Sequence, residues 1–233
     1  MPVALITGGS AGLGKALANA LADRGWSLII DGRRVARLEH VVAELSERTT
    51  VIGLAGNVTD PRHRDELAAA VAGFGRLDLL VSNASTLGPS PLPSLMSLPL
   101  DGLRQAHEVN VVAPLALAQL VIPTLVRSDG ALLNISSDAA VASYPGWGAY
   151  GSAKAALDHL TATLAAEHPS LRCYAVDPGD LRTDMHQAAF PDEDISDRPL
   201  PETAVPALLE LLNRRPASGR YRTSDFAPVP VTN

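Results

Sequence analysis

The chain has 233 residues, of which 46% are hydrophobic, enough for the core of one α/β domain. Its net charge of −6 argues against nonspecific binding to nucleic acid or to an anionic membrane. Cys173 is the only cysteine, which excludes an internal disulfide and favours a reducing compartment. No uninterrupted apolar run reaches the ~18 residues of a membrane span. We therefore expect a soluble, cytoplasmic protein.

Apolar runs alternate with helical patterns from the amino terminus onward. The pattern predicts strands at residues 2–7, 26–31, 51–55, 77–82, 131–136 and 171–176, with a final strand within 219–226. It predicts helices at residues 12–24, 35–48, 61–74, 103–126, 153–167 and 202–213. Asp60 is expected to cap the third helix, and Pro114 and Pro123 to bend the fourth. The alternation is typical of a single domain, residues 1–233, built on a doubly wound parallel sheet with helices on both faces.

Ligands of such sheets bind beyond the carboxyl ends of the strands. The segment from Thr7 to Gly14 lies there, between the first strand and the first helix. Its glycines permit a tight turn and a close approach of the backbone to a phosphate, next to the amino terminus of a helix. Leu17 occupies the place of the third glycine in the G-x-G-x-x-G pattern, so a tight turn without a ligand is the alternative.

Tyr150 and Lys154 are four residues apart, so a helix places them on one face. A phenol with its ordinary pKa near ~10 is a weak proton donor or acceptor at neutral pH, and a nearby ammonium group stabilises its anion. A hydroxyl of Ser136 or Ser137, at the end of the fifth strand, could bind the substrate oxygen. An isolated Tyr-x-x-x-Lys pair is nevertheless common on solvated helices.

In their order and spacing, these residues resemble the short-chain dehydrogenase/reductase family. The resemblance spans Val3 to about Met185 and rests on Thr7-Gly8-x-x-x-Gly12-x-Gly14, Asn83-Ala84, Asn110, Ser137, Tyr150-x-x-x-Lys154 and Pro178-Gly179. It implies a Rossmann fold of about seven strands and a nicotinamide cofactor, with no metal. The implied activity is reversible hydride transfer between a carbonyl compound and an alcohol.

The resemblance also implies a role for each matching residue. Tyr150 would be the general acid in carbonyl reduction and the base in the reverse reaction. Lys154 would lower the pKa of Tyr150 and hold the nicotinamide ribose. Ser137 would bind the substrate oxygen, with Ser136 facing away from the site, and Asn110 would support a proton-relay water or bond backbone groups. The cofactor would be bound by Gly8, Ser10, Gly12, Leu13, Gly14, Arg33, Arg34, Asn57, Val58, Asn83, Ala84, Tyr150, Lys154, Pro178, Gly179, Leu181 and Thr183.

Three positions depart from the family pattern. Ser85 stands where a glycine is usual after Asn83-Ala84, so the cofactor loop is expected to differ there. Asn57 replaces the aspartate that commonly meets the adenine amino group, and its amide oxygen could still accept that hydrogen bond. Asp177 replaces an asparagine before Pro178-Gly179. None of the three changes affects a residue that is expected to take part in proton transfer.

Two interpretations of cofactor choice compete at the end of the second strand. Asp31 lies nineteen residues after Gly12, where an acid usually binds the ribose of NAD. Gly32, Arg33 and Arg34 instead resemble the Gly-Arg form of NADP-dependent members, in which an arginine meets the 2′-phosphate. The orientation of Asp31 decides between them, and we favour NADP(H) over NAD(H).

Two other classes of function are weaker alternatives. A non-catalytic regulatory protein of this fold would be expected to lack Ser137, Tyr150 or Lys154. A serine hydrolase would need a Gly-x-Ser-x-Gly turn, which flanks neither Ser136 nor Ser137. Sugar-nucleotide epimerases of the family carry a longer carboxyl-terminal portion than the 55 residues that follow Pro178 here.

Residues 184–201 are expected to cover the substrate, and their sequence names no ligand. Within them, Met185, Ala188, Ala189 and Phe190 would form an apolar wall suited to a small carbonyl or secondary alcohol substrate, unless they only pack on the core. His186 is interpreted as a surface residue. The apolar helices at 103–126 and 153–167 are expected to pair copies of the chain in a homodimer or homotetramer.

Overall fold

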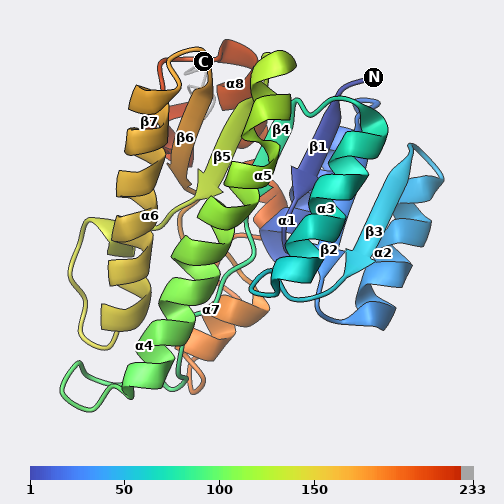
Figure 1. The fold of residues 1–233 in the computed structure, drawn as a ribbon. Coiled ribbons are helices and arrows are strands. Elements are labelled where there is room, and N and C mark those ends of the chain that lie inside the picture. Colours follow the sequence, from blue (N-terminus) through green and yellow to red (C-terminus); the bar gives the residue numbers. More distant parts are fainter. Residues whose placement is uncertain (227–233) are drawn as a thin grey trace, which may run out of the picture.

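The computed structural model describes residues 1–226, which fold around one seven-stranded parallel sheet (Figure 1). The order of the strands across the sheet is β3-β2-β1-β4-β5-β6-β7. The strands are β1 (Val3–Ile6), β2 (Ser27–Gly32), β3 (Val51–Ala55), β4 (Leu79–Ser82), β5 (Ala131–Ile135), β6 (Arg172–Asp177) and β7 (Gly219–Arg222). This architecture confirms the predicted doubly wound sheet of the Rossmann type.

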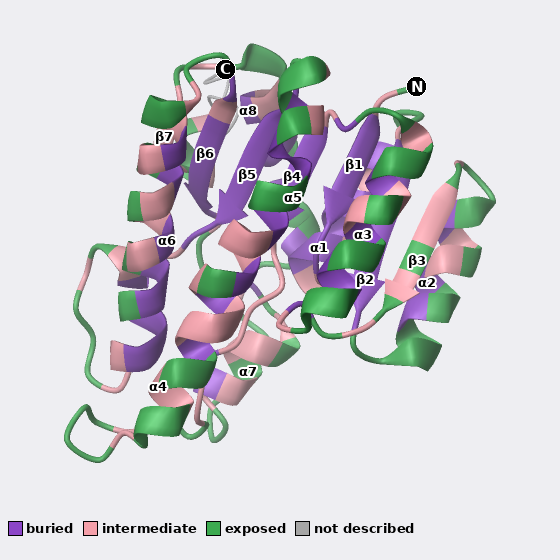
Figure 2. Ribbon diagram, in the orientation of Figure 1, coloured by how far each residue is buried: buried purple, intermediate pink, exposed green. Residues whose placement is uncertain are grey.

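Helices cover both faces of the sheet, which leaves its central strands fully buried (Figure 2). One face packs against α1 (Gly12–Ala22), α2 (Val35–Ser46) and α8 (Val205–Arg214). The other packs against α3 (Pro61–Phe74), α5 (Ala113–Arg127) and α6 (Gly148–Glu167). A strand that is buried on both faces is apolar at every position, as Val3–Ile6 is. For this reason the apolar runs in the sequence predicted the positions of the strands.

Most predicted boundaries are confirmed to within a few residues, and the Asp60 carboxylate caps α3 by accepting a hydrogen bond from the Arg62 amide.

The helix predicted at residues 103–126 consists of two α-helices joined by a π-helical turn. An α-helix, α4 (Leu100–His107), passes through a π-helical turn at Glu108–Val112 into α5. Pro114 has no N–H to bond the Asn110 carbonyl, and it lies in the first turn of α5 directly after the π-helical turn, whereas Pro123 lies inside α5, which continues to Arg127.

Two further differences lie near the site. The helix α6 begins at Gly148, five residues before the predicted start, so Tyr150 is already helical. The segment predicted to be loose contains a short helix, α7 (Asp184–Ala189), in which the Thr183 hydroxyl caps the His186 amide at 3.1 Å. The last predicted strand ends at Arg222 and is followed by a 3₁₀ turn at Thr223–Phe226.

The joined helix Leu100–Arg127 is long and apolar enough to cross a membrane by length and composition, although the sequence shows no uninterrupted apolar run of that length. Leu117, Val121 and Leu125 are buried against the sheet. This packing accounts for much of the apolar character of the helix.

The strand order reverses between β1 and β4, which lie side by side. The chain leaves β1 toward β2 and β3 on one side, whereas β5 and β6 continue from β4 on the other. At such a switch point, the loops that follow the two central strands diverge and leave a crevice at the carboxyl edge of the sheet. The fold therefore places the glycine-rich segment and the Asn83 loop at the same edge.

Candidate active site

A cleft of about 1520 Å³ lies along the carboxyl edge of the sheet. It exceeds the ~300–1,000 Å³ of most pockets for small ligands, so it has room for a dinucleotide and a second compound. The predicted site residues line this cleft, with two exceptions, Gly14 and Asn110. The structure thus brings to one cleft predicted site residues that lie more than 170 positions apart in the sequence, between Gly8 and Thr183.

The loop between β1 and α1 has the features of a phosphate site. Gly8 and Gly12 have φ angles of +65° and +50°, a conformation that side chains other than hydrogen disfavour. Ala11 is the N-cap of α1 and offers no side-chain hydrogen bond to the helix, so its first N–H groups remain for a ligand. Gly14 is needed for close packing rather than for its backbone conformation, because a side chain there would collide with Asn83 and the Gly8 carbonyl.

Thr7 joins this loop to the one after β4. Its hydroxyl oxygen accepts hydrogen bonds from the amides of Asn83 and Ala84, at 3.0 and 3.1 Å. The Asn83 side chain in turn donates to the carbonyls of Thr7 and Gly8. The two loops at the switch point are therefore held in one arrangement before any ligand contributes.

Asp31 faces the interior and is 1% exposed. Its Oδ1 accepts a hydrogen bond from the Gly8 amide at 2.6 Å, and its Oδ2 lies 3.0 Å from Nε2 of the buried His63. Both carboxylate oxygens are thus engaged by protein groups. This is the inward orientation required by the Gly-Arg interpretation of the second strand.

Gly32 packs directly against Ser10, whose Oγ would collide with any Cβ at this position. An acidic side chain at this position, which would select NAD in the family register, would force the Ser10 side chain to move. Arg33 and Arg34 follow at the rim of the cleft, both exposed, and neither forms a salt bridge or side-chain hydrogen bond within residues 1–226. Two free guanidinium groups beside a glycine are suited to binding a phosphate dianion.

Tyr150 and Lys154 occupy the first turns of α6, at the other end of the cleft, and are 5% and 2% exposed. The Lys154 Nζ donates to the Ile135 carbonyl at 2.7 Å and lies 5.5 Å from the centroid of the Tyr150 ring. Burial lowers the pKa of Lys154 to about 8, opposed by the Asp158 carboxylate, so the ammonium form still dominates at neutral pH.

Burial also raises the pKa of Tyr150, while the nearby hydroxyls of Ser137 and Ser85 act in the opposite direction. The net direction is opposite to the one expected from Lys154. Tyr150 is therefore protonated at neutral pH, as a proton donor must be.

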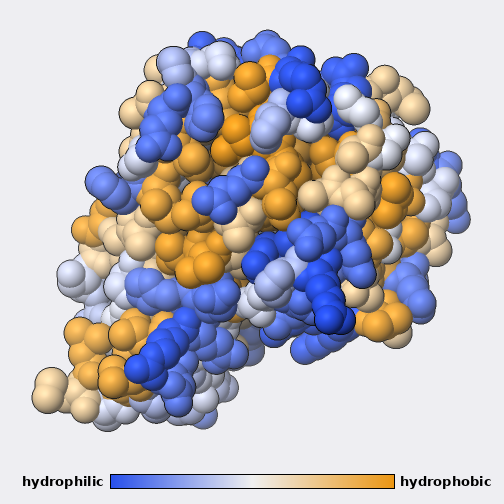
Figure 3. Space-filling model, in the orientation of Figure 1, coloured by the Kyte–Doolittle hydropathy of each residue, from blue (hydrophilic) through white to orange (hydrophobic). Residues whose placement is uncertain are grey.

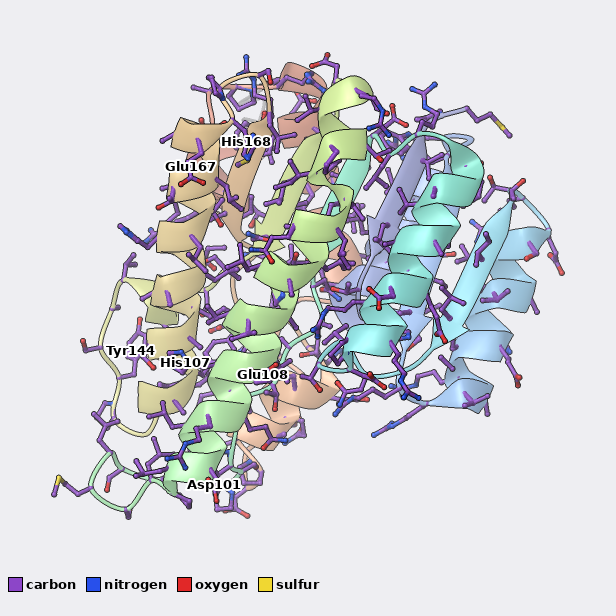
Figure 4. The ribbon with its side chains drawn as sticks, viewed as in Figure 1. Asp101, His107, Glu108, Tyr144, Glu167 and His168 are labelled. Atoms are coloured by element: carbon purple, nitrogen blue, oxygen red, sulfur yellow. The ribbon has the colours of Figure 1, made fainter. Side chains whose placement is uncertain are left out.

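Both serines after β5 border the cleft; Ser136, which was expected to face away from the site, is 2% exposed, and Ser137 is partly exposed. The Ser137 hydroxyl donates to Asp138 at 3.0 Å, and Tyr144 donates to the other oxygen of that carboxylate at 2.7 Å. Figure 4 shows Tyr144 at the end of α6 that carries the site, with Glu167 and His168 at the far end of the same helix.

Asn110 lies in the π-helical turn, behind the wall of the cleft, and is 1% exposed. Its Nδ2 donates to the Thr86 carbonyl at 2.8 Å, and its Oδ1 accepts from the Ser85 hydroxyl at 2.7 Å. The backbone-bonding role left open for Asn110 is thus present. Ser85, the departure from the usual glycine, links this asparagine to the surroundings of Tyr150, and the family pattern gave no signal for that link.

Arg220 on β7 connects several elements around Ser137, a contact that the sequence did not indicate. Its Nη2 donates to the Ser137 carbonyl at 2.8 Å, and its Nε donates to Asp158 on α6 at 2.9 Å. The same guanidinium lies 3.5 Å from Asp177 at the end of β6. One side chain therefore connects the strands β6 and β7, the helix α6 and the backbone of Ser137.

We expect Arg220→Met to lower the free energy of unfolding by about 2 kcal/mol, because it leaves two largely buried carboxylates without their partner. Arg222→Met is the matched control, since Arg222 is more exposed and lies 3.9 Å from Asp177. Its loss should cost less than about 1 kcal/mol. Urea denaturation followed by circular dichroism measures both, and equal losses would show that Arg220 has no special bracing role.

Apolar side chains close the cleft beside Tyr150. Trp147 packs edge-on against Tyr150, with ring centroids 5.7 Å apart, and lies 6.0 Å from Phe190. Met185, Ala188 and Phe190 line the cleft as predicted, while Ala189 is buried beneath them. His186 is partly buried and packs on Phe190 at 5.1 Å between ring centroids, so it is not a free surface residue.

Comparison with known proteins identifies the architecture. The sequence pattern of the family described as short chain dehydrogenase matches residues 2–194. The chain belongs to this family. A serine 3-dehydrogenase of Agrobacterium fabrum is 34% identical over 185 residues, 78% of this chain and 72% of that protein.

Solved structures of the family superimpose closely. A short chain dehydrogenase from Shigella flexneri, complexed with NADP, has a TM-score of 0.87 at 29% identity and covers 96% of this chain and 97% of its own. One from Escherichia coli, complexed with NADPH, has a TM-score of 0.87 at 30% identity and covers 95% and 96%. The chain is thus an oxidoreductase of the short-chain dehydrogenase family.

Proposed function

We propose that the protein is an NADP(H)-dependent oxidoreductase that interconverts a small apolar carbonyl compound and its secondary alcohol. The observation that carries the proposal is the convergence of Ser137, Tyr150 and Lys154 at one end of the cleft, with the glycine loop and two exposed arginines at the other. The nicotinamide bound there would supply or accept the hydride. A ketoreductase needs no more than this hydride and one proton.

The residues of the chain supply that proton. In reduction, the Tyr150 hydroxyl donates its proton to the oxygen that gains negative charge, and the Ser137 hydroxyl hydrogen-bonds the same oxygen. The Lys154 ammonium lies close enough to stabilise the phenolate that remains. In alcohol oxidation the same proton returns to Tyr150. The raised pKa of Tyr150 keeps the phenol protonated at neutral pH, which is the form that a proton donor in reduction needs.

The cofactor preference rests on the other end of the cleft. Both carboxylate oxygens of Asp31 are engaged by Gly8 and His63, and Gly32 places no acidic side chain at the NAD-selecting position. Arg33 and Arg34, which have no salt bridge or side-chain hydrogen bond within residues 1–226, would complement the 2′-phosphate of NADP(H). The complexes of the Shigella and Escherichia relatives with NADP and NADPH agree with this preference.

The experiment that tests the function is turnover of a panel of ketones, aldehydes and secondary alcohols with each cofactor. Loss of the near-ultraviolet absorbance of NADPH in the presence of a ketone or aldehyde is the expected result. Apolar members of the panel should react better than charged ones, because the wall beside Tyr150 is formed by Trp147, Met185 and Phe190. Binding of NADPH with no turnover of any compound would favour the non-catalytic alternative.

We also propose a homodimer or homotetramer that pairs through α5 and α6. Apolar surface gathers over these helices in Figure 3, where Leu120 and Val126 of α5 are 44% and 38% exposed, and Val112 in the turn before α5 is 45% exposed. Apolar patches of this kind commonly mark contacts between chains. Light scattering should give a multiple of the 24.4 kDa chain mass at micromolar concentration, and Leu120→Arg should shift it toward the monomer. A monomeric wild-type protein would contradict the proposal.

A further inference from the structure

Asp31 and His63 form a buried ionisable pair for which the proposed proton chemistry has no use. They are 1% and 4% exposed, with Oδ2 of Asp31 3.0 Å from Nε2 of His63. The pair links two elements, since Asp31 is in β2 and His63 is in the first turn of α3. A single buried charge is costly, whereas an aspartate and a cationic histidine together carry no net charge.

The surroundings favour the cationic form of the histidine. The hydrogen bond with Asp31 raises the pKa of His63, burial opposes it, and Glu66, whose carboxylate lies 3.7 Å from Nδ1, adds to the increase. The loop after β3 contributes no charge here, because Gly56 packs against the ring so closely that any side chain would collide with it. Asp31 from β2 and Glu66 from α3 are thus the acids in contact with the ring.

The pair lies next to the subsite expected to bind the 2′-phosphate. Asp31 precedes Gly32 and Arg33 directly, and all three line the same cleft. A carboxylate without a counter-charge would repel a phosphate dianion at this place, since juxtaposed like charges cost several kcal/mol in a binding site. Asp31 nevertheless lies at this place, where its carboxylate accepts a hydrogen bond from the Gly8 amide at 2.6 Å.

We propose that His63 determines cofactor specificity, because its positive charge cancels that of Asp31 and so lets the Gly32-Arg33-Arg34 segment accept a 2′-phosphate. The Asp31 carboxylate then keeps its hydrogen bond to the glycine loop without opposing the phosphate. The inference rests on the proposed preference for NADP(H) and extends it to a residue with its own place in the fold. His63 acts through Asp31 and has no contact with the cofactor in this proposal.

A cycle of four proteins tests the inference: wild type, His63→Gln, Asp31→Asn and the double variant. Glutamine in place of His63 can still donate a hydrogen bond to Asp31 but carries no charge, and asparagine in place of Asp31 can still accept from the Gly8 amide. NADPH and NADH are titrated separately by quenching of intrinsic fluorescence. His159→Gln is the matched control, since His159 is exposed on α6 and does not line the cleft.

We expect His63→Gln to weaken NADPH binding about tenfold and NADH binding less than about twofold, because the 2′-phosphate distinguishes the two ligands. The double variant should recover NADPH affinity to within about threefold of wild type, because no uncompensated carboxylate remains. The control should change neither affinity. Equal loss of both cofactors without recovery in the double variant would reduce His63 to a structural role and overturn the inference.

The Asp31→Asn protein keeps the test decisive if His63→Gln does not fold. It should bind NADPH at least as tightly as wild type, and a weaker preference for NADPH would overturn the inference. A different result, in which wild type itself prefers NADH and Asp31→Asn loses that affinity, would instead identify Asp31 as the ribose ligand. That outcome would refute the proposed NADP(H) preference, on which the inference rests, and is distinguishable from a failure of the inference alone.

Discussion

Tyr150→Phe should lower kcat for carbonyl reduction by ~10²–10⁴-fold, the usual contribution of general acid–base catalysis. The substitution keeps the ring, which packs against Trp147 at 5.7 Å between centroids, and removes only the hydroxyl with its transferable proton. Cofactor binding should stay close to that of wild type, because the glycine loop and the arginines lie at the other end of the cleft. Steady-state turnover and a separate NADPH titration measure the two properties.

Tyr221→Phe is a suitable control for this substitution. Tyr221 lies on β7, where its hydroxyl donates to the Ala217 carbonyl at 2.7 Å, away from the cleft. It should retain activity within about twofold of wild type, since it loses one exposed hydrogen bond of little net energy. Retention of more than about a tenth of the activity in Tyr150→Phe would contradict the assignment of Tyr150 as the proton donor.

The fold was predictable because its sequence signals are local and repeated. Buried parallel strands require short apolar runs, and the helices between them carry their own periodicity, so each element could be placed without knowing its neighbours. The helix 103–126 was expected to bend at Pro114 and Pro123, whereas the structure has a π-helical turn at Glu108–Val112, just before Pro114. A short helix such as α7 depends on contacts and a cap rather than on periodicity.

The site was predictable where each residue acts through its own chemistry. The roles expected of Ser137, Tyr150, Lys154 and the glycines follow from their types and spacing, and the structure brings Ser137, Tyr150, Lys154, Gly8 and Gly12 to one cleft. The residues that support them were not foreseen, because Arg220 and His63 matter only through partners distant in the sequence. Asp31 did offer a signal. Because a carboxylate at the end of an apolar strand is costly to bury alone, its position indicated that a cationic side chain lies beside it.

The pKa of Tyr150 is raised, whereas the Tyr150–Lys154 pair alone predicted that it would be lowered. Spacing correctly placed Lys154 beside Tyr150 and suggested a lowered pKa. The same packing that brings the two side chains together also removes them from water, and burial dominates for both groups. Desolvation depends on every neighbour at once, so it cannot be obtained from the spacing of two residues.

Arg33→Ala should weaken NADPH binding by about ten- to a hundredfold. This corresponds to on the order of 1.5–3 kcal/mol, the range for a hydrogen bond to a charged group. NADH binding should change by less than about twofold, because NADH lacks the 2′-phosphate that the guanidinium would meet. Arg33 forms no salt bridge or side-chain hydrogen bond within residues 1–226, so little native structure is lost with it. Isothermal titration with each cofactor measures the effect.

Arg24→Ala is the matched control for this substitution. Arg24 follows α1 at the opposite end of that helix from the glycine loop, and its guanidinium donates to the Ala20 carbonyl at 2.9 Å. Both proteins lose one exposed positive charge, so a general change in electrostatic attraction affects them equally, while a specific phosphate contact affects Arg33→Ala alone. Raising the ionic strength should shrink the difference between the two variants, since screening weakens an exposed ion contact. Unchanged NADPH affinity in Arg33→Ala would mean that Arg33 does not bind the 2′-phosphate, and the preference would then have to come from Arg34 or be absent.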